Sequence, residues 1–312
     1  MKRQLRIFAE PTAVQAVDVT SYDVLAVSSS AGKDSQAMLD RIVELATAAG
    51  VKDRIVVIHA DLGRVEWQGT RELAEEQAHA YGVRFMVVSR QGTVSDGRSK
   101  EGVPLYAKGE VRGDLIDHVR HRAAQLRAQG KDSPAWPSPQ NRWCTSDHKR
   151  GPIGGAFTTL ACCWRAAHPD ERRPCRILDC IGLRSEESPA RAKHANLEER
   201  TSTRSQHVDT WLPIQDWTVG QVWDRIRKSG VRHHYAYDLG MPRLSCCLCI
   251  YAPREALLLA GYHNQALLRD YVAVEQETDS TFGFDFALGD ILREVEGMTE
   301  PPAKVSNWGA GA

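Results

Sequence analysis

The stretch from Asp23 to Gly50 reads DVLAVSSSAGKDSQAMLDRIVELATAAG and decides the fold. Its first six residues, DVLAVS, form a short apolar run of the kind found in buried strands. Small residues follow, and from Met38 onward apolar side chains recur at helical spacing until Gly50 supplies a stop signal. The stretch therefore predicts a strand, a tight loop and a helix in succession.

The same alternation continues along the chain. Apolar runs of strand type occur at 54–60, 84–89 and 176–183, with a later strand expected near 210–214. Helical signals cover 70–81, 114–129 and 218–230. Strands that alternate with helices form a parallel sheet with right-handed crossovers. We therefore predict an α/β fold, a parallel sheet with helices on both faces, with a mainly helical C-terminal region.

These elements also suggest a division of the chain into parts. We expect residues 1–217 to form an α/β domain that carries the loop, and residues 218–300 to form a helical region that contains cysteines. Residues 301–312 are expected to be a flexible tail.

The composition is that of an ordinary globular protein. The 312 residues are 42% hydrophobic and 26% charged, which excludes disordered and fibrous classes. No uncharged apolar run reaches the roughly 18 residues needed to span a bilayer. The N-terminus lacks the apolar stretch of a signal peptide. We expect a cytoplasmic protein with no membrane partner.

Charge is balanced overall but unevenly distributed. The chain has 40 Lys and Arg against 40 Asp and Glu. Residues 90–150 hold twelve Lys and Arg against seven acidic residues, whereas residues 270–300 hold nine acidic residues and one Arg. The basic stretch could face a polyanion or be a solvated surface. The neutral total suggests that a partner, rather than this chain, holds any nucleic acid substrate.

The loop SAGKDS at residues 30–35 is suited to bind phosphate. Small residues let backbone amides approach an anion closely, and the N-terminus of the following helix adds a partial positive charge. Lys33 could add a full charge, and the hydroxyls of Ser30 and Ser35 could donate hydrogen bonds. The loop is not a Walker A motif, and no GxGxxG dinucleotide motif occurs.

SAGKDS after an apolar strand resembles the PP-loop, usually SGGKDS, of ATP pyrophosphatases and PAPS reductases. Ala31 stands where that motif usually has its first Gly. Four further segments resemble the same family in the same order, so the resemblance spans residues 23–252. They are HADLG at 59–63 with Glu66 and Thr70, RWCT at 142–145 with Lys149 and Pro152, IGLR at 181–184 with Glu186, Glu187, Ser188 and Arg191, and RLSCCLC at 243–249, in which Ser245 replaces a Gly.

The resemblance implies ATP or an adenylylated sulfur compound as ligand, with Mg²⁺ and with Asp61 near the nucleotide. Independently, an Asp at the carboxyl end of a strand is well placed to ligate a hard cation. Arg184 and Arg191 would suit phosphate or sulfate, or an ion-pair network with Glu186 and Glu187. The expected catalytic residues are Lys33, Asp34, Asp61 and Arg184. The expected nucleotide-binding residues are Ser28, Ser30, Ala31, Gly32, Lys33, Asp34, Ser35, His59, Asp61, Gly182, Arg184 and Arg191.

Eight cysteines in a chain expected in the cytosol indicate metal, redox or buried-thiol roles rather than disulfides. Cys246 and Cys249 form a CxxC, and the resemblance pairs Cys144 with them as in iron-sulfur members of the family. Thiolates at this spacing suit a 4Fe-4S cluster or zinc. Three ligands are one fewer than a closed cluster needs, which leaves an open iron, Cys247 or an unidentified fourth ligand.

The remaining cysteines, histidines and tryptophans are expected to have structural rather than functional roles. Cys180 and Cys175 are expected to be buried thiols, and Trp223 to lie in a core. His233 and His234 are expected at the surface. The pair Cys162-Cys163 is reminiscent of APS reductases but lacks the basic and proline residues that follow in that family; here such residues follow Cys144.

Several functions remain open on this basis. Sulfonucleotide reduction requires a nucleophilic cysteine after the sheet region, and this chain has none beyond Cys249, which disfavours that activity. The set of motifs most resembles the ATP pyrophosphatases of DNA phosphorothioation, in which adenylation would activate a backbone phosphate for sulfur incorporation. A cysteine desulfurase and DNA-modification proteins are the implied partners. The alternatives are PAPS or APS reduction, tRNA thiolation, and a nucleotide or redox sensor; the oligomeric state stays open.

Overall fold

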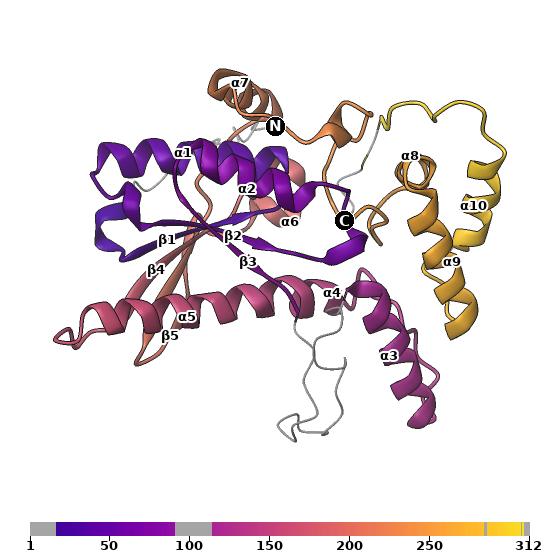
Figure 1. Ribbon diagram of the computed structural model, residues 1–312, viewed down its shortest axis with the longest axis horizontal. Helices are drawn as coiled ribbons and strands as arrows, with labels where there is room; N and C mark the ends of the chain where they lie inside the picture. The colour runs from indigo at the N-terminus through magenta and orange to yellow at the C-terminus, as the bar shows by residue number, and fades with distance from the viewer. Residues whose placement is uncertain (1–16, 91–113, 284–285, 307, 309–312) are drawn as a thin grey trace, which may run out of the picture.

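The computed structural model describes residues 17–90, 114–283, 286–306 and 308. Within these ranges, no helix combines the length and the apolar composition that crossing a membrane requires. The predicted strand, loop and helix at 23–50 are present (Figure 1).

A six-stranded sheet forms the centre of the molecule. The strands are β1 (Val24–Ser29), β2 (Ile55–Ala60), β3 (Arg84–Val88), β4 (Cys175–Cys180), β5 (Leu197–Ser202) and β6 (Gln206–Trp211). Their spatial order is β3-β2-β1-β4-β6-β5. All neighbouring pairs are parallel except β5 and β6, which are antiparallel. The predicted α/β class is confirmed, and the antiparallel edge strand β5 is an addition to it.

Helices cover both faces of this sheet. The longer ones are α1 (Lys33–Ala48), α2 (Thr70–Ala80), α3 (Leu115–Ala128), α5 (Gly151–Ala167), α7 (Val219–Ser229), α8 (Arg254–His263), α9 (Gln265–Thr278) and α10 (Leu288–Glu296). The short helices and turns are η1 (Val19–Ser21), η2 (Lys52–Arg54), η3 (Gly63–Val65), α4 (Trp143–Thr145), η4 (Ser146–Arg150), η5 (Ser185–Glu187), α6 (Pro189–Ala192) and η6 (Tyr235–Tyr237).

The alternation of side chains along β1 separates two hydrophobic cores. Leu25 and Val27 pack with α1 and α7 on one face, whereas Val24 and Ala26 pack with α5 on the other. Because successive side chains of a strand point to opposite faces, an apolar run such as VLAV can fill both cores at once. Figure 1 shows α1 and α5 on opposite sides of the sheet.

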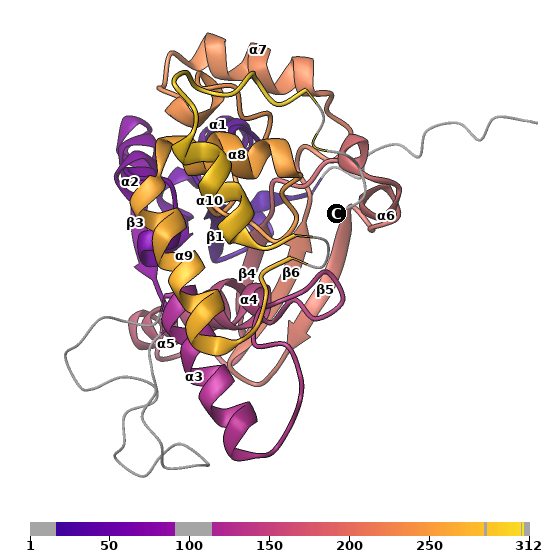
Figure 2. The ribbon, with the colours of Figure 1, turned by 90° about the vertical axis from the view of Figure 1, so that its right-hand side faces the viewer.

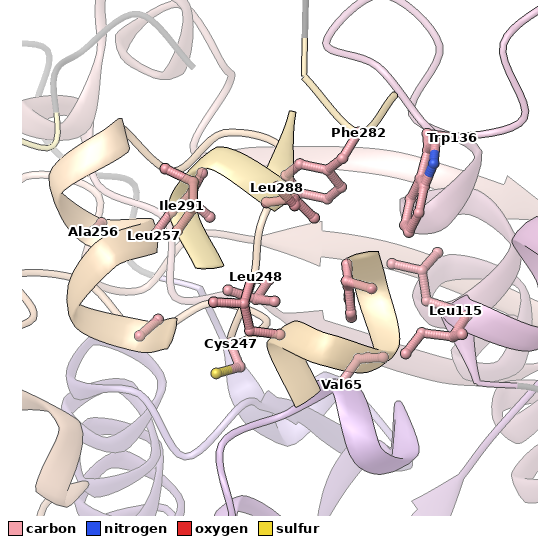
Figure 3. Close-up of a cluster of buried hydrophobic side chains, with 14 of the residues drawn as sticks. Val65, Leu115, Trp136, Cys247, Leu248, Ala256, Leu257, Phe282, Leu288 and Ile291 are labelled. Carbon is pink, nitrogen blue, oxygen red and sulfur yellow. The ribbon is translucent and has the colours of Figure 1, made fainter. Parts of the chain in front are cut away.

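A third core lies beside the sheet and is built mainly by α3, α8, α9 and α10 (Figures 2 and 3). Here α3, from the first expected part of the chain, packs on α9 from the second. Conversely, α7 from the second part packs on α1. The boundary expected at residue 217 therefore does not separate the hydrophobic cores.

The C-terminal segment also differs from the expected flexible tail. Within residues 301–306, the side chain of Val305 is buried in the third core. Its amide donates a hydrogen bond of 3.2 Å to the carbonyl oxygen of Gly240. The described part of this segment is thus packed against the turn that follows η6.

Candidate functional site

The loop that leaves β1 at the carboxyl edge of the sheet is held by its own small side chains. The amide of Ala31 donates to Ser29 Oγ at 3.2 Å, and the amide of Ser30 donates to Ser35 Oγ at 3.3 Å. Ser35 Oγ in turn donates to the carbonyl oxygen of Gly32 at 2.9 Å. These contacts fix the loop without bulky side chains.

Three amides at this position are available to a ligand. The N–H groups of Gly32, Asp34 and Ser35 have no acceptor within the described part of the chain. They belong to the N-terminus of a 16-residue helix, whose dipole places partial positive charge there. The combination of open amides and helix dipole favours a bound phosphate.

Ala31 adopts a left-handed backbone conformation, with φ at +56°. A non-glycine residue there costs about 1–2 kcal/mol. This is the position at which the PP-loop motif usually has Gly, so the structure explains that usual choice by the backbone angle.

Replacing Ala31 by Gly is expected to change the free energy of unfolding by less than about 1 kcal/mol. Relief of the left-handed strain offsets the lost burial of one methyl group, about 0.8 kcal/mol, and the greater flexibility of Gly in the unfolded chain. The matched control is Ala37→Gly, equally buried within α1, which should cost about 2 kcal/mol. Urea denaturation of both variants compares the two; equal losses would contradict the strain argument.

Asp34 is the centre of a buried ionic network behind the loop. Its Oδ2 lies 2.8 Å from Lys33 Nζ, and its Oδ1 lies 2.6 Å from Arg184 Nε. Arg184 also contacts Glu186 and donates to the carbonyl oxygen of Trp217 at 3.2 Å. Burial raises the pKa of Asp34, but the two cations outweigh it and leave that pKa below its usual value. Arg184 thus lies in an ion-pair network, as one interpretation expected, but with Asp34 and Glu186 as its partners, and phosphate binding by Arg184 stays a prediction.

The segment that follows β4 contains Gly182 and packs closely against the backbone of the loop. A Cβ atom on Gly182 would lie 3.0 Å from the carbonyl carbon and oxygen of Asp34 and 3.1 Å from the Ser35 nitrogen. Arg191, further along, pairs with Glu187, which also accepts the Arg184 amide at 3.0 Å. Gly182 is therefore required for the close approach of the two segments.

His59 and Asp61 take supporting positions. His59 is buried, with Nδ1 3.0 Å from the Ser29 carbonyl oxygen and Nε2 3.2 Å from Glu66 Oε2. Burial lowers the pKa of His59, but hydrogen bonding to Glu66 outweighs this and raises it. Asp61 Oδ1 accepts the Gly63 amide at 2.8 Å, and Asp61 does not line the cavity described next.

A cavity of about 420 Å³ opens over the loop. It brings together five predicted phosphate-loop residues with Gly182, Arg191 and all three cysteines proposed as metal ligands. The loop residues that line it are Ser28, Ser30, Gly32, Asp34 and Ser35. Five of the expected site residues lie outside its lining: Ala31, Lys33, His59, Asp61 and Arg184.

Cys144, Cys246 and Cys249 are half-buried and line this one cavity although they come from two distant segments. Burial raises the pKa of Cys246 to about 11, and the nearby Lys149 opposes that shift. Among the residues that the structure describes, no three His, Cys, Asp or Glu are grouped as a metal site. The cysteines thus share a cavity without forming a metal-binding arrangement.

The remaining cysteines are separate from the cavity. Cys247 is fully buried in the third core, where Figure 3 shows its side chain among apolar neighbours. Cys175 and Cys180 are buried in β4, as predicted. Cys162 and Cys163 are exposed on α5.

Several cavity residues received no role in the sequence interpretation. Arg142, Lys149 and Arg243 supply cationic side chains to the lining, and Glu66 supplies a carboxylate. Lys149 and His148 project from a π-helical turn between α4 and α5, a type of distortion that is frequent at functional sites. The sequence signal was present, since all four residues stand in or beside the segments that carry the family resemblance.

His234 differs from the expected surface position, because it is fully buried. Its Nδ1 accepts the Ala236 amide at 3.1 Å, and its Nε2 lies 3.1 Å from Thr70 Oγ1. Thr70 Oγ1 donates to the carbonyl oxygen of Trp67 at 2.6 Å, so Nε2 carries the proton and the ring is neutral. His234 therefore ties η6 to the start of α2.

Burial of neutral His234 predicts acid sensitivity. Its pKa is lowered to about 4 by burial, against about 6.5 in an unfolded chain. Between these two values the unfolded state binds more protons than the folded state. The free energy of unfolding therefore falls by about 1.4 kcal/mol for each pH unit below 6.5, down to the folded-state pKa, and His234 has no such effect above pH 6.5. In urea denaturation at pH 7, 5.5 and 4.5, His234→Gln should show a shallower decline than the wild type. Equal declines would contradict this assignment.

The solved structures that resemble this one include three enzymes. Phosphoadenylyl-sulfate reductase from Candida auris is 15% identical with a TM-score of 0.43, covering 73% of this chain and 84% of that chain. FMN adenylyltransferase from Candida glabrata is 12% identical with a TM-score of 0.36, covering 72% and 55%. The U34-tRNA thiolase NcsA from Methanococcus maripaludis, solved with its 4Fe-4S cluster, is 10% identical with a TM-score of 0.32, covering 91% and 76%.

Sequence comparison is more informative about the family. An uncharacterized 37.8 kDa protein of Escherichia phage 186 is 35% identical over 77 residues, which cover 24% of this chain and less than a quarter, 22%, of that protein. The family model for the phosphoadenosine phosphosulfate reductase domain matches residues 24–252, from β1 through the CxxC segment. This chain therefore belongs to the phosphoadenosine phosphosulfate reductase domain family.

Proposed function

We propose that this chain is a PP-loop enzyme that cleaves ATP to AMP and pyrophosphate and adenylates an acceptor for sulfur incorporation. The observation that carries the proposal is that the phosphate-binding loop and three cysteines line one cavity of about 420 Å³. A nucleotide bound at the loop would present its α-phosphate within the same enclosure as the thiols. We infer that the acceptor is the backbone phosphate of DNA, as in phosphorothioation.

The residues of the chain support this chemistry in distinct ways. The open amides of Gly32, Asp34 and Ser35 would bind the phosphates that leave as pyrophosphate. The cations of Arg142, Lys149, Arg191 and Arg243 would stabilise charge on the acceptor and on the α-phosphate. The Asp34 carboxylate holds Lys33 and Arg184 in place.

Magnesium bound with ATP would neutralise phosphate charge. Three carboxylates line the cavity, those of Asp34, Glu66 and Glu187, and carboxylate oxygen is the donor that magnesium prefers. In the structure each is paired, Asp34 with Lys33 and Arg184, Glu66 with His59, and Glu187 with Arg191. The magnesium role of Asp61 stays a prediction, because its carboxylate is engaged by the Gly63 amide and faces Arg71 at 3.6 Å.

The thiols of Cys144, Cys246 and Cys249 have the donor chemistry of an iron-sulfur cluster with one iron not bound by cysteine, or of zinc. Their present arrangement is not that of a ligand set, so binding would require the CxxC segment to adjust. A cluster there would supply a site that carries sulfide. We propose a cysteine desulfurase as the sulfur source and DNA-modification proteins as the partners that hold the nucleic acid.

Sulfonucleotide reduction is the second candidate, favoured by the family of the matching domain model. The two activities differ in their products. ATP pyrophosphatase activity releases AMP and pyrophosphate. Reduction of an adenylyl sulfate takes two electrons from a dithiol added to the assay and releases sulfite and the adenosine phosphate.

The test is anaerobic purification followed by iron, zinc and sulfide analysis and by product assays with ATP and with adenylyl sulfates. We expect pyrophosphate from ATP and loss of that product in Asp34→Asn, whereas Cys246→Ser should lose bound iron or zinc and sulfur incorporation. Cys162→Ser, exposed on α5, is the control that should retain activity. Sulfite release without pyrophosphate would assign the reductase instead, and full activity in both site variants would overturn the proposal.

A further inference from the structure

Tyr237 reaches the phosphate-binding loop from a distant segment. It ends the turn η6, and its phenol oxygen accepts the Lys33 amide at 2.8 Å, at the N-terminus of α1. The residue is half-buried, and it lines the cavity over the loop. A tyrosine hydroxyl thus lies among the amides that would contact phosphate.

The position of this hydroxyl is fixed on two sides. His234, fully buried, anchors the turn to Thr70 of α2 through the hydrogen bonds described above. The Tyr237 ring packs edge-on against Trp223 of α7 at 5.1 Å between ring centroids. The phenol is therefore held in place before any ligand arrives, which removes the entropy cost of ordering it on binding.

The hydroxyl group of Tyr237 uses its oxygen as an acceptor, and its proton is available to a ligand. The oxygen accepts from the Lys33 amide and is also approached by the Leu244 amide. A phenol has a single proton to donate, and no acceptor for it occurs within the described ranges. Burial raises the pKa of Tyr237, so this proton stays on the oxygen throughout the neutral range.

Gly32 shows where this donor lies. A Cβ atom placed on Gly32 would be 3.3 Å from both the Tyr237 oxygen and Ser30 Oγ. The two hydroxyls therefore converge over the one residue of the loop that has no side chain. Ser30, Gly32 and Tyr237 all line the cavity, so an anion bound there by the loop amides would lie near both hydroxyls.

We propose that the Tyr237 hydroxyl donates a hydrogen bond to a phosphate oxygen of the bound nucleotide, and that Tyr237 is a binding residue for the leaving pyrophosphate. This rests on the proposed function, because it assumes a polyphosphate at the loop. The Lys33 amide stays with the phenol, so the phosphate is bound by the amides of Gly32, Asp34 and Ser35 and by the phenol. Because negative charge grows on the pyrophosphate as it leaves, the bond strengthens during the reaction.

The test compares Tyr237→Phe with the wild type in titration calorimetry. Phe keeps the ring against Trp223 and removes only the hydroxyl. We expect inorganic pyrophosphate and ATP to bind about 10- to 100-fold more weakly, as for loss of a hydrogen bond to a charged group. Adenosine, which has no phosphate, should bind equally to both. Tyr235→Phe, in the same turn and 39% exposed, is the control with unchanged affinities.

Equal pyrophosphate affinity of Tyr237→Phe and the wild type would overturn the inference. If Tyr237→Phe does not unfold cooperatively, Gly32→Ala serves instead, since its methyl group would displace the same hydroxyl, and unchanged pyrophosphate binding there would also overturn the inference. A wild type that binds pyrophosphate without cleaving ATP would refute the proposed function and the role in pyrophosphate departure, but not the hydrogen bond from Tyr237 to phosphate. A wild type that binds neither compound would refute both.

Discussion

Asp34→Ala is expected to lower the free energy of unfolding by about 3–5 kcal/mol, the range for removal of one partner from a buried ion pair. The Lys33 and Arg184 side chains are each only 5% exposed, and among the described residues no anion other than Asp34 pairs with Lys33 Nζ. Arg184 still has its ion pair with Glu186 in this variant, so most of the destabilisation comes from the unpaired charge of Lys33. Urea denaturation at pH 7 measures the effect.

Two further variants separate charge from packing in this network. Asp34→Asn keeps the size and one acceptor oxygen, so its loss should be smaller than that of Asp34→Ala. Adding Lys33→Met to Asp34→Ala removes the unpaired cation and should restore part of the stability. Asp224→Ala, whose partner Arg227 is exposed, is the control and should cost less than about 1 kcal/mol. A double variant as unstable as Asp34→Ala would refute the electrostatic explanation.

The first half of the fold could be predicted from the sequence because its signals are local. The helix α1 begins where small loop residues end, and the strands β1 and β2 are continuous apolar runs. The edge strand β5 reads LEERTS and has only one packed neighbour, β6, so it has no apolar run. The helix α5 begins GPIGG, which has the composition of a loop, although its buried residues 156, 157, 160 and 161 keep helical spacing.

The candidate site likewise has a part with local sequence signals and a part without them. The phosphate loop is contiguous, so residues 28–35 could be identified together with the segment that contains Gly182. The cavity wall, in contrast, brings Lys149 together with Tyr237, from a stretch almost 90 residues later, and only tertiary packing joins the two. His234 shows the limit clearly, because its partner Thr70 is 164 residues away and nothing local marks it as buried.

Gly182→Ala is expected to weaken ATP binding at least tenfold and to lower the free energy of unfolding by about 1–3 kcal/mol. The added Cβ would meet the Asp34 carbonyl carbon and oxygen at 3.0 Å and the Ser35 nitrogen at 3.1 Å. All three are backbone atoms of the first turn of α1, so no side chain can rotate to make room. The turn must shift, and with it the Asp34 and Ser35 amides that face the cavity.

The shift predicts a specific pattern of losses. The added methyl group would move the end of β4 away from the loop without disrupting the strand. Unfolding should therefore stay cooperative, while the affinities for ATP and pyrophosphate fall together. Gly154→Ala is the matched control, since a Cβ there meets nothing within 4 Å in α5 and Ala favours a helix by about 1 kcal/mol. Calorimetric titration and urea denaturation of both variants give the comparison. A Gly182→Ala protein that binds ATP like the wild type would mean that the close contact between these segments does not set the geometry of the loop.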